Sequence, residues 1–261
     1  MVTTTNFELE MGGLSFPASR PHRFGVCIDS AAAELEGLDA KNYLHRILLA
    51  PENREAFFDL IDREGLVVCK NLQIEDDTYR KVRGKSSAGR LSQAEYYHHD
   101  GCSCPTKPRI NEIRLPFHSI PRNVATAIAP FQDVVRAQLM ALPERLILDA
   151  EMESYRDLFS SASSASTDLP DVQLWDRIQG RVTRLVRRDL DAESSREYFR
   201  TVDRLAMAYD LPWENGESRL MLNAHEDLTR TMQHRRAFQK PKLAGEKNGS
   251  LVKRWTAEEF V

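Results

Sequence analysis

His98 and Asp100 are the residues of this chain whose types and spacing most clearly indicate chemistry. They stand two positions apart, so both side chains fall on the same face of an extended strand. An imidazole and a carboxylate placed side by side are two of the three ligands of a 2-His-1-carboxylate iron site, which leaves coordination positions open for a co-substrate and O2. His225 and His234 are the downstream candidates for the third ligand. The pattern therefore predicts a metal site assembled from distant segments.

The cysteines permit a second metal hypothesis. Cys102 and Cys104 closely follow the His-Asp pair and could bind zinc with a neighbouring histidine. Structural zinc sites usually have wider gaps within a ligand pair and a second pair elsewhere, so we expect these cysteines to line the mouth of the site instead. Cys27 and Cys69 stand alone in apolar surroundings and are expected to be buried thiols.

The composition is that of an ordinary soluble globular protein. The chain has 261 residues, of which 41% are hydrophobic and 29% charged. A net charge of -3 gives no electrostatic basis for binding nucleic acid or an anionic membrane. No stretch approaches the roughly 18 apolar residues of a transmembrane helix, and the N-terminus has no apolar run typical of a signal peptide. We therefore expect a cytoplasmic protein; the sequence is also compatible with an oligomer.

The first part of the chain predicts elements that deliver the His-Asp pair. A helix is expected to start near Pro51 and to end at Gly65, before the buried strand 66–69. Residues 78–82 are interpreted as a helical turn, and 95–98 as a strand that carries the candidate ligands. Residues 1–22 show little apolar periodicity and are expected to be poorly ordered.

The later part predicts strands on both sides of a helical block. Helical periodicity runs from Phe131 to Leu148 and again from 172 to 208, so we expect a helical insertion at about 131–208. Its function is interpreted as packing rather than as a substrate lid. The expected strands are 112–115, 123–128, 219–223, 229–238 and 250–255. Residues 23–261 are thus interpreted as a single domain.

Three stretches together resemble a known family. They are Phe57 to Val68, His98-His99-Asp100 with the later Ala125-Thr126-Ala127-Ile128, and Asp227 to Phe238. They are similar to the iron(II)/2-oxoglutarate-dependent dioxygenases, in the branch of taurine dioxygenase and clavaminate synthase. The resemblance implies a mainly β fold with α-helices: a double-stranded β-helix, or jelly-roll, with flanking helices and the helical insert. Arg235 stands where the family has a glycine.

The resemblance also implies roles for individual residues. His98, Asp100 and His234 would bind Fe(II) and form the catalytic centre, while Arg254 and Thr126 would bind 2-oxoglutarate. An arginine suits this task because its planar fork pairs with a carboxylate through two hydrogen bonds. The alternative is that His225 is the third ligand, with Arg236 binding the co-substrate; we favour His234.

The implied reaction uses Fe(II), 2-oxoglutarate and O2 to hydroxylate an unactivated C–H bond, with release of succinate and CO2. The expected substrate is a small polar metabolite, such as an amino acid or a natural-product intermediate. Desaturation and ring closure are variant outcomes. Two other hypotheses remain: a cupin-type metalloenzyme that does not use 2-oxoglutarate, and a non-enzymatic helical binding protein in which the His-x-Asp pattern is accidental.

Overall fold

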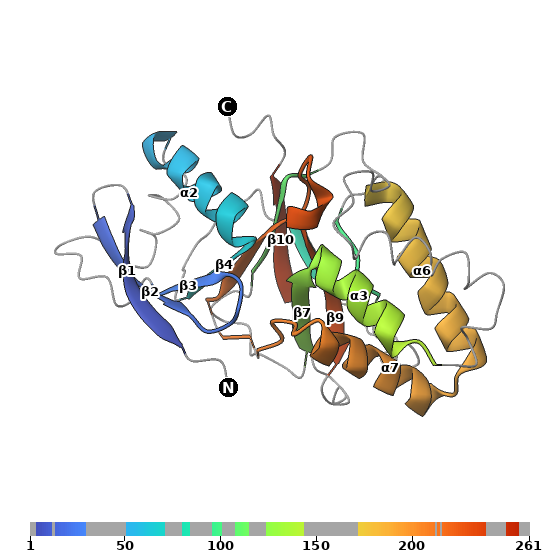
Figure 1. Ribbon diagram of the computed structural model, residues 1–261. Helices are drawn as coiled ribbons and strands as arrows, with labels where there is room; N and C mark the ends of the chain where they lie inside the picture. Colours follow the sequence, from blue (N-terminus) through green and yellow to red (C-terminus); the bar gives the residue numbers. More distant parts are fainter. Residues whose placement is uncertain are drawn as a thin grey trace.

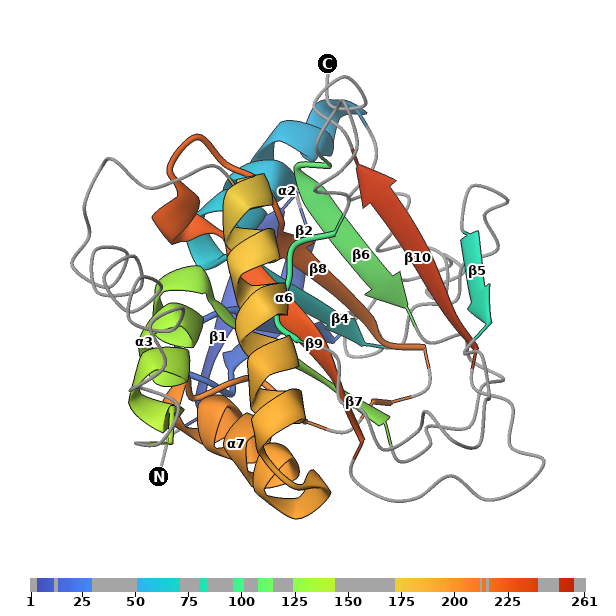
Figure 2. The same cartoon turned by 90° about the vertical axis from the view of Figure 1, so that its right-hand side faces the viewer.

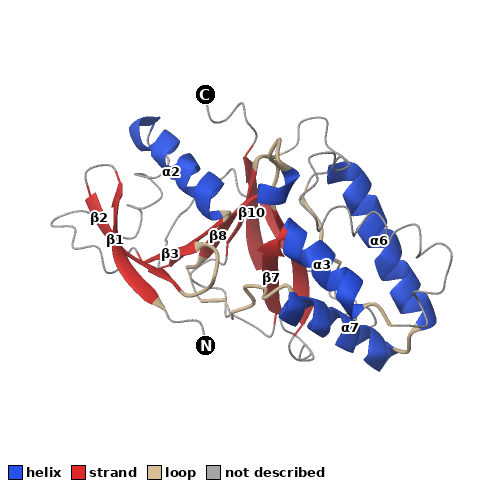
Figure 3. Ribbon diagram, in the orientation of Figure 1, coloured by secondary structure: helices blue, strands red, loops and turns tan. Residues whose placement is uncertain are grey.

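The computed structural model has a sheet-rich architecture with helices on its outside (Figures 1 and 3). It describes residues 4–11, 14–29, 51–70, 80–83, 96–100, 108–114, 124–143, 172–211, 213–214, 216–238 and 249–255. The strands are β1 (Thr5–Met11), β2 (Leu14–Arg20), β3 (Val26–Asp29), β4 (Leu66–Lys70), β5 (Arg80–Arg83), β6 (Ile110–Arg114), β7 (Val124–Pro130), β8 (Ser218–Leu222), β9 (Met232–Phe238) and β10 (Gly249–Trp255). The helices are α2 (Pro51–Glu64), α3 (Phe131–Ala141), α6 (Val172–Asp189), α7 (Ala192–Leu205) and the 3-10 turn η1 (Leu228–Arg230).

The described strands form two sheets. The larger has eight strands in the order β1-β2-β3-β4-β8-β6-β10-β5, and the smaller pairs β7 with β9. Neighbours run antiparallel except β3 and β4, which are parallel. Strands distant in sequence thus become neighbours.

Successive side chains of a strand point to opposite faces of the sheet, so the apolar residues of one strand belong to two different clusters of the core. In β4, Val67 and Cys69 pack with the apolar face of α2, whereas Leu66 and Val68 belong to a cluster that also contains Ile128 of β7. Because successive strand side chains point to opposite faces, one run of apolar residues fills both layers. The second cluster contains residues of both sheets, so the inner face of β7–β9 packs toward the larger sheet.

The helices of the predicted insertion cover the other face of β7 and β9. Ala127 and Ala129 of β7 cluster with Phe131 of α3, Trp175 of α6 and Phe199 of α7. Figure 2 shows α6 passing in front of β9, with α3 and α7 beside it. The described part of 131–208 therefore contains three helices, and these pack on the smaller sheet.

Gly65 makes the predicted turn from α2 into β4. Its φ is 72°, a left-handed conformation that glycine adopts without strain. Its amide donates to Ile61 O at 2.8 Å and its carbonyl accepts from Leu222 N at 2.9 Å. A Cβ at this position would lie 2.9 Å from Met232 Sδ. The glycine thus ends the helix and lets β9 approach closely.

Three expectations about local structure were wrong. Residues 5–20, expected to be poorly ordered, form the β1–β2 pair, and Phe16 of β2 is fully buried. Residues 80–82, part of the helical turn expected at 78–82, belong instead to β5, at the edge of the larger sheet next to β10. Around the His-Asp pair there is an isolated bridge at His98 rather than a strand of a sheet.

Among the described residues, no helix is long and apolar enough to cross a membrane.

Candidate metal centre

A short antiparallel bridge places His98 directly opposite His234. The amide of His98 donates to His234 O at 3.1 Å, and the amide of His234 donates to His98 O at 3.2 Å. Residues opposite one another in such a bridge carry their side chains on the same face. The two imidazole rings accordingly have centroids 4.5 Å apart. His234 belongs to β9, whose register is fixed by its pairing with β7.

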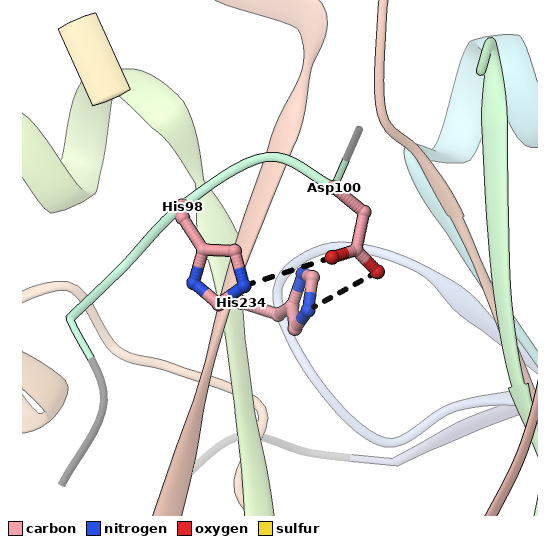
Figure 4. A group of neighbouring side chains, drawn as sticks. All are labelled: His98, Asp100 and His234. Carbon is pink, nitrogen blue, oxygen red and sulfur yellow. Dashed lines mark ion pairs between the residues drawn. The ribbon is translucent and has the colours of Figure 1, made fainter. Parts of the chain in front are cut away.

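Asp100 completes a group of three potential ligands (Figure 4). Its Oδ1 lies 3.7 Å from His98 Nε2, and its Oδ2 lies 3.8 Å from His234 Nε2. These separations exceed a hydrogen bond, but a single ion can reach two donors that lie within about 4.2 Å, twice a typical metal–nitrogen distance. Both separations from Asp100 are within this reach, and the donor atoms of all three residues lie within 4.8 Å of one another. Two imidazoles and one carboxylate are a donor set that suits iron, so these residues fit a metal.

A hydrogen bond to the backbone turns the correct nitrogen of His98 toward the group. Its Nδ1 lies 2.8 Å from the carbonyl oxygen of Tyr96. A carbonyl can only accept, so Nδ1 carries the proton and the Nε2 of the neutral ring presents its lone pair. Nε2 is the atom that faces Asp100. Metal-binding histidines are commonly oriented in this way.

Two asparagines that the sequence analysis did not single out hold Asp100. Asn111 Nδ2 donates to Asp100 Oδ2 at 2.7 Å, and Asn223 Oδ1 accepts from the Asp100 amide at 2.7 Å. Asn223 Nδ2 also donates to the carbonyls of Asp100 and Pro108, both at 2.9 Å. Both asparagines are fully buried. No feature of the sequence indicated these roles, because Asn111 stands in the mixed polar and apolar strand β6 and both contacts depend on how distant segments pair.

The group is buried unevenly. The side chain of His234 is 8% exposed, whereas those of His98 and Asp100 are 21% and 17% exposed. Tyr96 stands beside His98, with 5.5 Å between ring centroids, and its hydroxyl lies 3.5 Å from Asp176 Oδ2 of α6. Burial raises the pKa of the Asp176 carboxyl, although nearby His98 acts in the opposite direction. Tyr96 and Asp176 thus lie beside His98, which is more exposed than His234.

The other candidate ligand, His225, lies apart from this group. Its Nδ1 accepts from the Asp227 amide at 2.9 Å, and its Nε2 lies 3.6 Å from Asp62 Oδ2 and 3.2 Å from Arg230 Nη1. These contacts place it at the C-terminal end of α2, next to η1. Among the described residues, the group of potential metal ligands contains His234 and not His225.

The residues expected to bind the co-substrate lie on strands next to the group. Thr126 is buried on β7, and its hydroxyl oxygen accepts from Trp213 Nε1 at 3.2 Å. In the sheet register Thr126 is opposite Arg236, two positions from the pair Ile128 and His234. Arg254 of β10 is opposite Asn111 of β6, the residue that donates to Asp100. Both arginines thus occupy register positions close to the candidate ligands.

His99 is packed away from the group, on the opposite side of the chain from His98. Only 2% of it is exposed, its Nε2 lies 2.9 Å from Thr231 Oγ1, and its ring centroid lies 5.9 Å from that of Phe131. Thr231 Oγ1 donates to Leu228 O, so it accepts from His99 Nε2. His99 is accordingly not a member of the group of potential metal ligands.

The buried thiols were predicted correctly. Cys27 and Cys69 are both buried and free. Burial raises the pKa of Cys27 to about 11, and that of Cys69 well above its usual value. Cys102 and Cys104, the basis of the zinc hypothesis, lie outside the described residues.

Comparisons with known proteins identify the fold. Neither a protein-family model nor a curated protein matches the sequence. Among solved structures, PvcB, an Fe, alpha-ketoglutarate dependent oxygenase from an isonitrile synthetic pathway, matches with a TM-score of 0.51 at 11% identity, over 98% of this chain and 92% of PvcB. A structure of PvcB from Pseudomonas aeruginosa gives 0.50 at 11% identity with the same coverage. AAD-2 in complex with Mn(II) and N-oxalylglycine gives 0.46 at 12% identity over 98% of both chains.

The chain therefore has the fold of an Fe, alpha-ketoglutarate dependent oxygenase. PvcB is one solved structure with this fold. The resemblance predicted from the sequence is confirmed at the level of the fold.

Proposed function

We propose that this protein is an Fe(II)/2-oxoglutarate-dependent oxygenase that hydroxylates an unactivated C–H bond of a small polar metabolite. The observation that supports this most strongly is the convergence of His98, Asp100 and His234 within the fold of such an oxygenase. The histidines come from segments more than a hundred residues apart, and a metal site is a specific reason for them to meet.

The proposal includes a double-stranded β-helix as the core. In this interpretation β7–β9 is part of the second sheet of the barrel, opposite the larger sheet. The apolar cluster that joins Ile128 and Met232 to Val68 and Met221 supports it, because those residues come from both sheets. The candidate ligand His234 is opposite Ile128 in the register, at the edge of this cluster.

In the proposed centre, His98, Asp100 and His234 would hold the metal, and a set of only three protein ligands would leave it able to bind the co-substrate and O2. The Tyr96 carbonyl keeps the proton of His98 on Nδ1, and Asn111 holds the orientation of the carboxylate. When bound, Fe(II) supplies the oxygen chemistry, in which 2-oxoglutarate is converted to succinate and CO2 while the substrate is hydroxylated. The protein's task is to position the reactants and limit the access of water.

Arg254 is our candidate for binding the distal carboxylate of 2-oxoglutarate. It is opposite Asn111 in the β10–β6 register, and Asn111 is the residue that donates to Asp100. Arginine suits this role because it stays charged and can form two parallel hydrogen bonds with a carboxylate. The Thr126 hydroxyl accepts from Trp213 and still has its own proton to donate. Arg236, opposite Thr126, is the alternative.

The small substrate is proposed to approach over Tyr96 and Asp176. Both lie on the more exposed side of the group, beside His98. An aromatic ring and a carboxylate can contact a polar metabolite through stacking, hydrogen bonds or an ion pair. The cytoplasmic location stays a prediction from the sequence.

An anaerobic titration tests the proposal. Protein with Fe(II) and 2-oxoglutarate is expected to show a weak metal-to-ligand charge-transfer band, and admission of air should yield succinate. Absence of both would contradict the proposal. Metal binding without the band or succinate would favour the cupin-type alternative, in which the three ligands act without 2-oxoglutarate. A chain that binds no metal would favour the non-enzymatic hypothesis.

A further inference from the structure

Asp203 of α7 connects the neighbours of both candidate histidine ligands. The Tyr97 hydroxyl donates to Asp203 Oδ1 at 2.8 Å, and Arg235 Nε donates to the same oxygen at 2.7 Å. Arg235 Nη2 pairs with Asp203 Oδ2, so the guanidinium forms two bonds with the carboxylate. Tyr97 immediately precedes His98, and Arg235 immediately follows His234. One carboxylate thus joins the two chain segments that must hold their histidines at a fixed separation.

These contacts lie behind the metal centre. Side chains alternate along extended chain, so Tyr97 and Arg235 point toward the helices while His98 and His234 point toward each other. Tyr97 accordingly belongs to the apolar cluster of α3, α6 and α7, and the Arg235 guanidinium carbon lies 5.5 Å from the ring centroid of Phe199. Asp203 therefore affects the ligand geometry through the backbone and does not touch the metal.

Tyr97, Arg235 and Asp203 are buried, and Arg235 and Asp203 carry opposite charges. The side chain of Arg235 is 3% exposed and that of Asp203 is 13% exposed, while Tyr97 is 1% exposed. Burial, and next the charge of Asp203, raise the pKa of Tyr97 well above its usual value, so the hydroxyl keeps the proton that it donates. A buried ion pair adds little net stability compared with apolar packing, but its bidentate geometry fixes the positions of its members.

We propose that Asp203 is a positioning residue for the metal centre: by binding Tyr97 and Arg235 together it sets the separation and orientation of His98 and His234. This inference rests on the proposed function, because it requires that the two histidines bind a metal. The proposal accounts for Arg235, which directly follows His234, because a small residue at this position could not bind Asp203 of α7. The same two chain segments are also joined by an uncharged contact, in which Gln233 Nε2 lies 3.3 Å from His99 Nδ1.

The test measures Co(II) binding to the full-length chain. Asp203→Asn removes the charge with little change in shape, and Tyr97→Phe removes only the hydroxyl in case the first variant folds poorly. The matched control is Glu64→Gln, which breaks another two-bond arginine–carboxylate pair, Arg20 with Glu64, on the far side of the larger sheet. Circular dichroism checks that each metal-free variant is folded, and thermal unfolding gives its unfolding temperature. Metal binding is then compared at a temperature below that of every variant.

Asp203→Asn is expected to weaken Co(II) binding by about 10- to 100-fold, the usual effect of losing a group that orients a ligand. The visible absorption of the remaining complex should also change, because the band positions report coordination geometry. Tyr97→Phe should weaken binding less, since the ion pair remains. Glu64→Gln should lower the unfolding temperature without changing affinity or spectrum.

Two results would overturn the inference. One is wild-type Co(II) affinity and spectrum in both Asp203→Asn and Tyr97→Phe. The other is an equal loss of affinity in Glu64→Gln at the same loss of stability, which would reduce the effect to general destabilisation. Failure of the wild-type chain to bind Co(II) is a separate result: it removes the proposed metal centre itself and the inference with it.

Discussion

The amides and carbonyls of His98 and His234 exchange two hydrogen bonds, of 3.1 and 3.2 Å. This bridge joins a short segment near the middle of the sequence to β9 near its end. Because it is isolated, the bridge does not inherit its register from a longer strand pair. The register must come from β7–β9 on one side and from the contacts of residues 96–100 on the other.

The tautomer of His98 is a direct consequence of the hydrogen bond from Nδ1 to the Tyr96 carbonyl. We expect metal-free protein at a pH where the ring is neutral to carry its proton on Nδ1. Long-range ¹H–¹⁵N NMR correlations distinguish the two tautomers of a neutral histidine. His99 is the internal comparison, because its Nε2 donates to Thr231 and its proton should lie on the other nitrogen. A proton on Nε2 of His98 would contradict this account.

Asn111→Leu should weaken metal binding by about 10- to 100-fold, because Asp100 Oδ2 loses the donor that orients it. Leucine has a similar size, so the fold should survive. Equilibrium dialysis against Co(II) measures the change. Ile113→Val is the control on the same strand: it removes a methyl group from the core, at about 0.5–1.5 kcal/mol of stability, and should leave metal affinity unchanged.

Gly65→Ala should destabilise the fold by about 1–3 kcal/mol, because a residue with a Cβ is strained at a φ of 72°. The new Cβ would also lie 2.9 Å from Met232 Sδ, at the start of the strand that carries His234. Urea unfolding measures the loss. Gly180→Ala is the matched control inside α6, where the Cβ would make an ordinary contact of 3.4 Å with Tyr96, and a gain of about 0.5–1 kcal/mol is expected.

The Arg20–Glu64 pair predicts a pH-dependent contribution to stability. The hydrogen bond from Arg20 holds the pKa of the Glu64 carboxyl below its ordinary value of 4.5, although burial opposes this. A carboxyl whose pKa is lower in the folded state adds stability above its unfolded pKa, and this stability is lost as pH falls through the folded pKa. Wild type should therefore exceed Glu64→Gln in unfolding free energy at pH 7, and the difference should shrink below about pH 4.5. A difference that is constant between pH 7 and pH 3 would exclude this contribution.

Elements with a strong apolar pattern could be predicted from the sequence. The apolar run of β4, the helix before Gly65 and the strands β7, β8 and β10 all lie close to where the pattern placed them. The strand β5 was missed because Arg80–Arg83 is short and charged, and its strand conformation depends on pairing with β10. In β1 and β2 the alternation of Phe7 with Leu9, and of Phe16 with Ala18, was present but was not recognised.

Some residues of the candidate site could likewise be predicted from the sequence, and others could not. A spacing of two predicted that His98 and Asp100 share a face, and the choice of His234 over His225 agrees with the observed group. Asn111, Asn223 and Asp203 could not be assigned in advance, because each acts through the register or packing of a distant segment. A single sequence does not specify those contacts until the sheets are assembled.

The central claim is that His98, Asp100 and His234 hold one metal ion, and the iron content of single variants tests it most directly. Wild-type chain, His234→Ala and His225→Ala are each dialysed anaerobically against Fe(II) and analysed for iron per folded chain. Wild type and His225→Ala are expected to retain about one Fe(II), and His234→Ala to retain almost none. Retention of iron by His234→Ala together with its loss from His225→Ala would contradict the account.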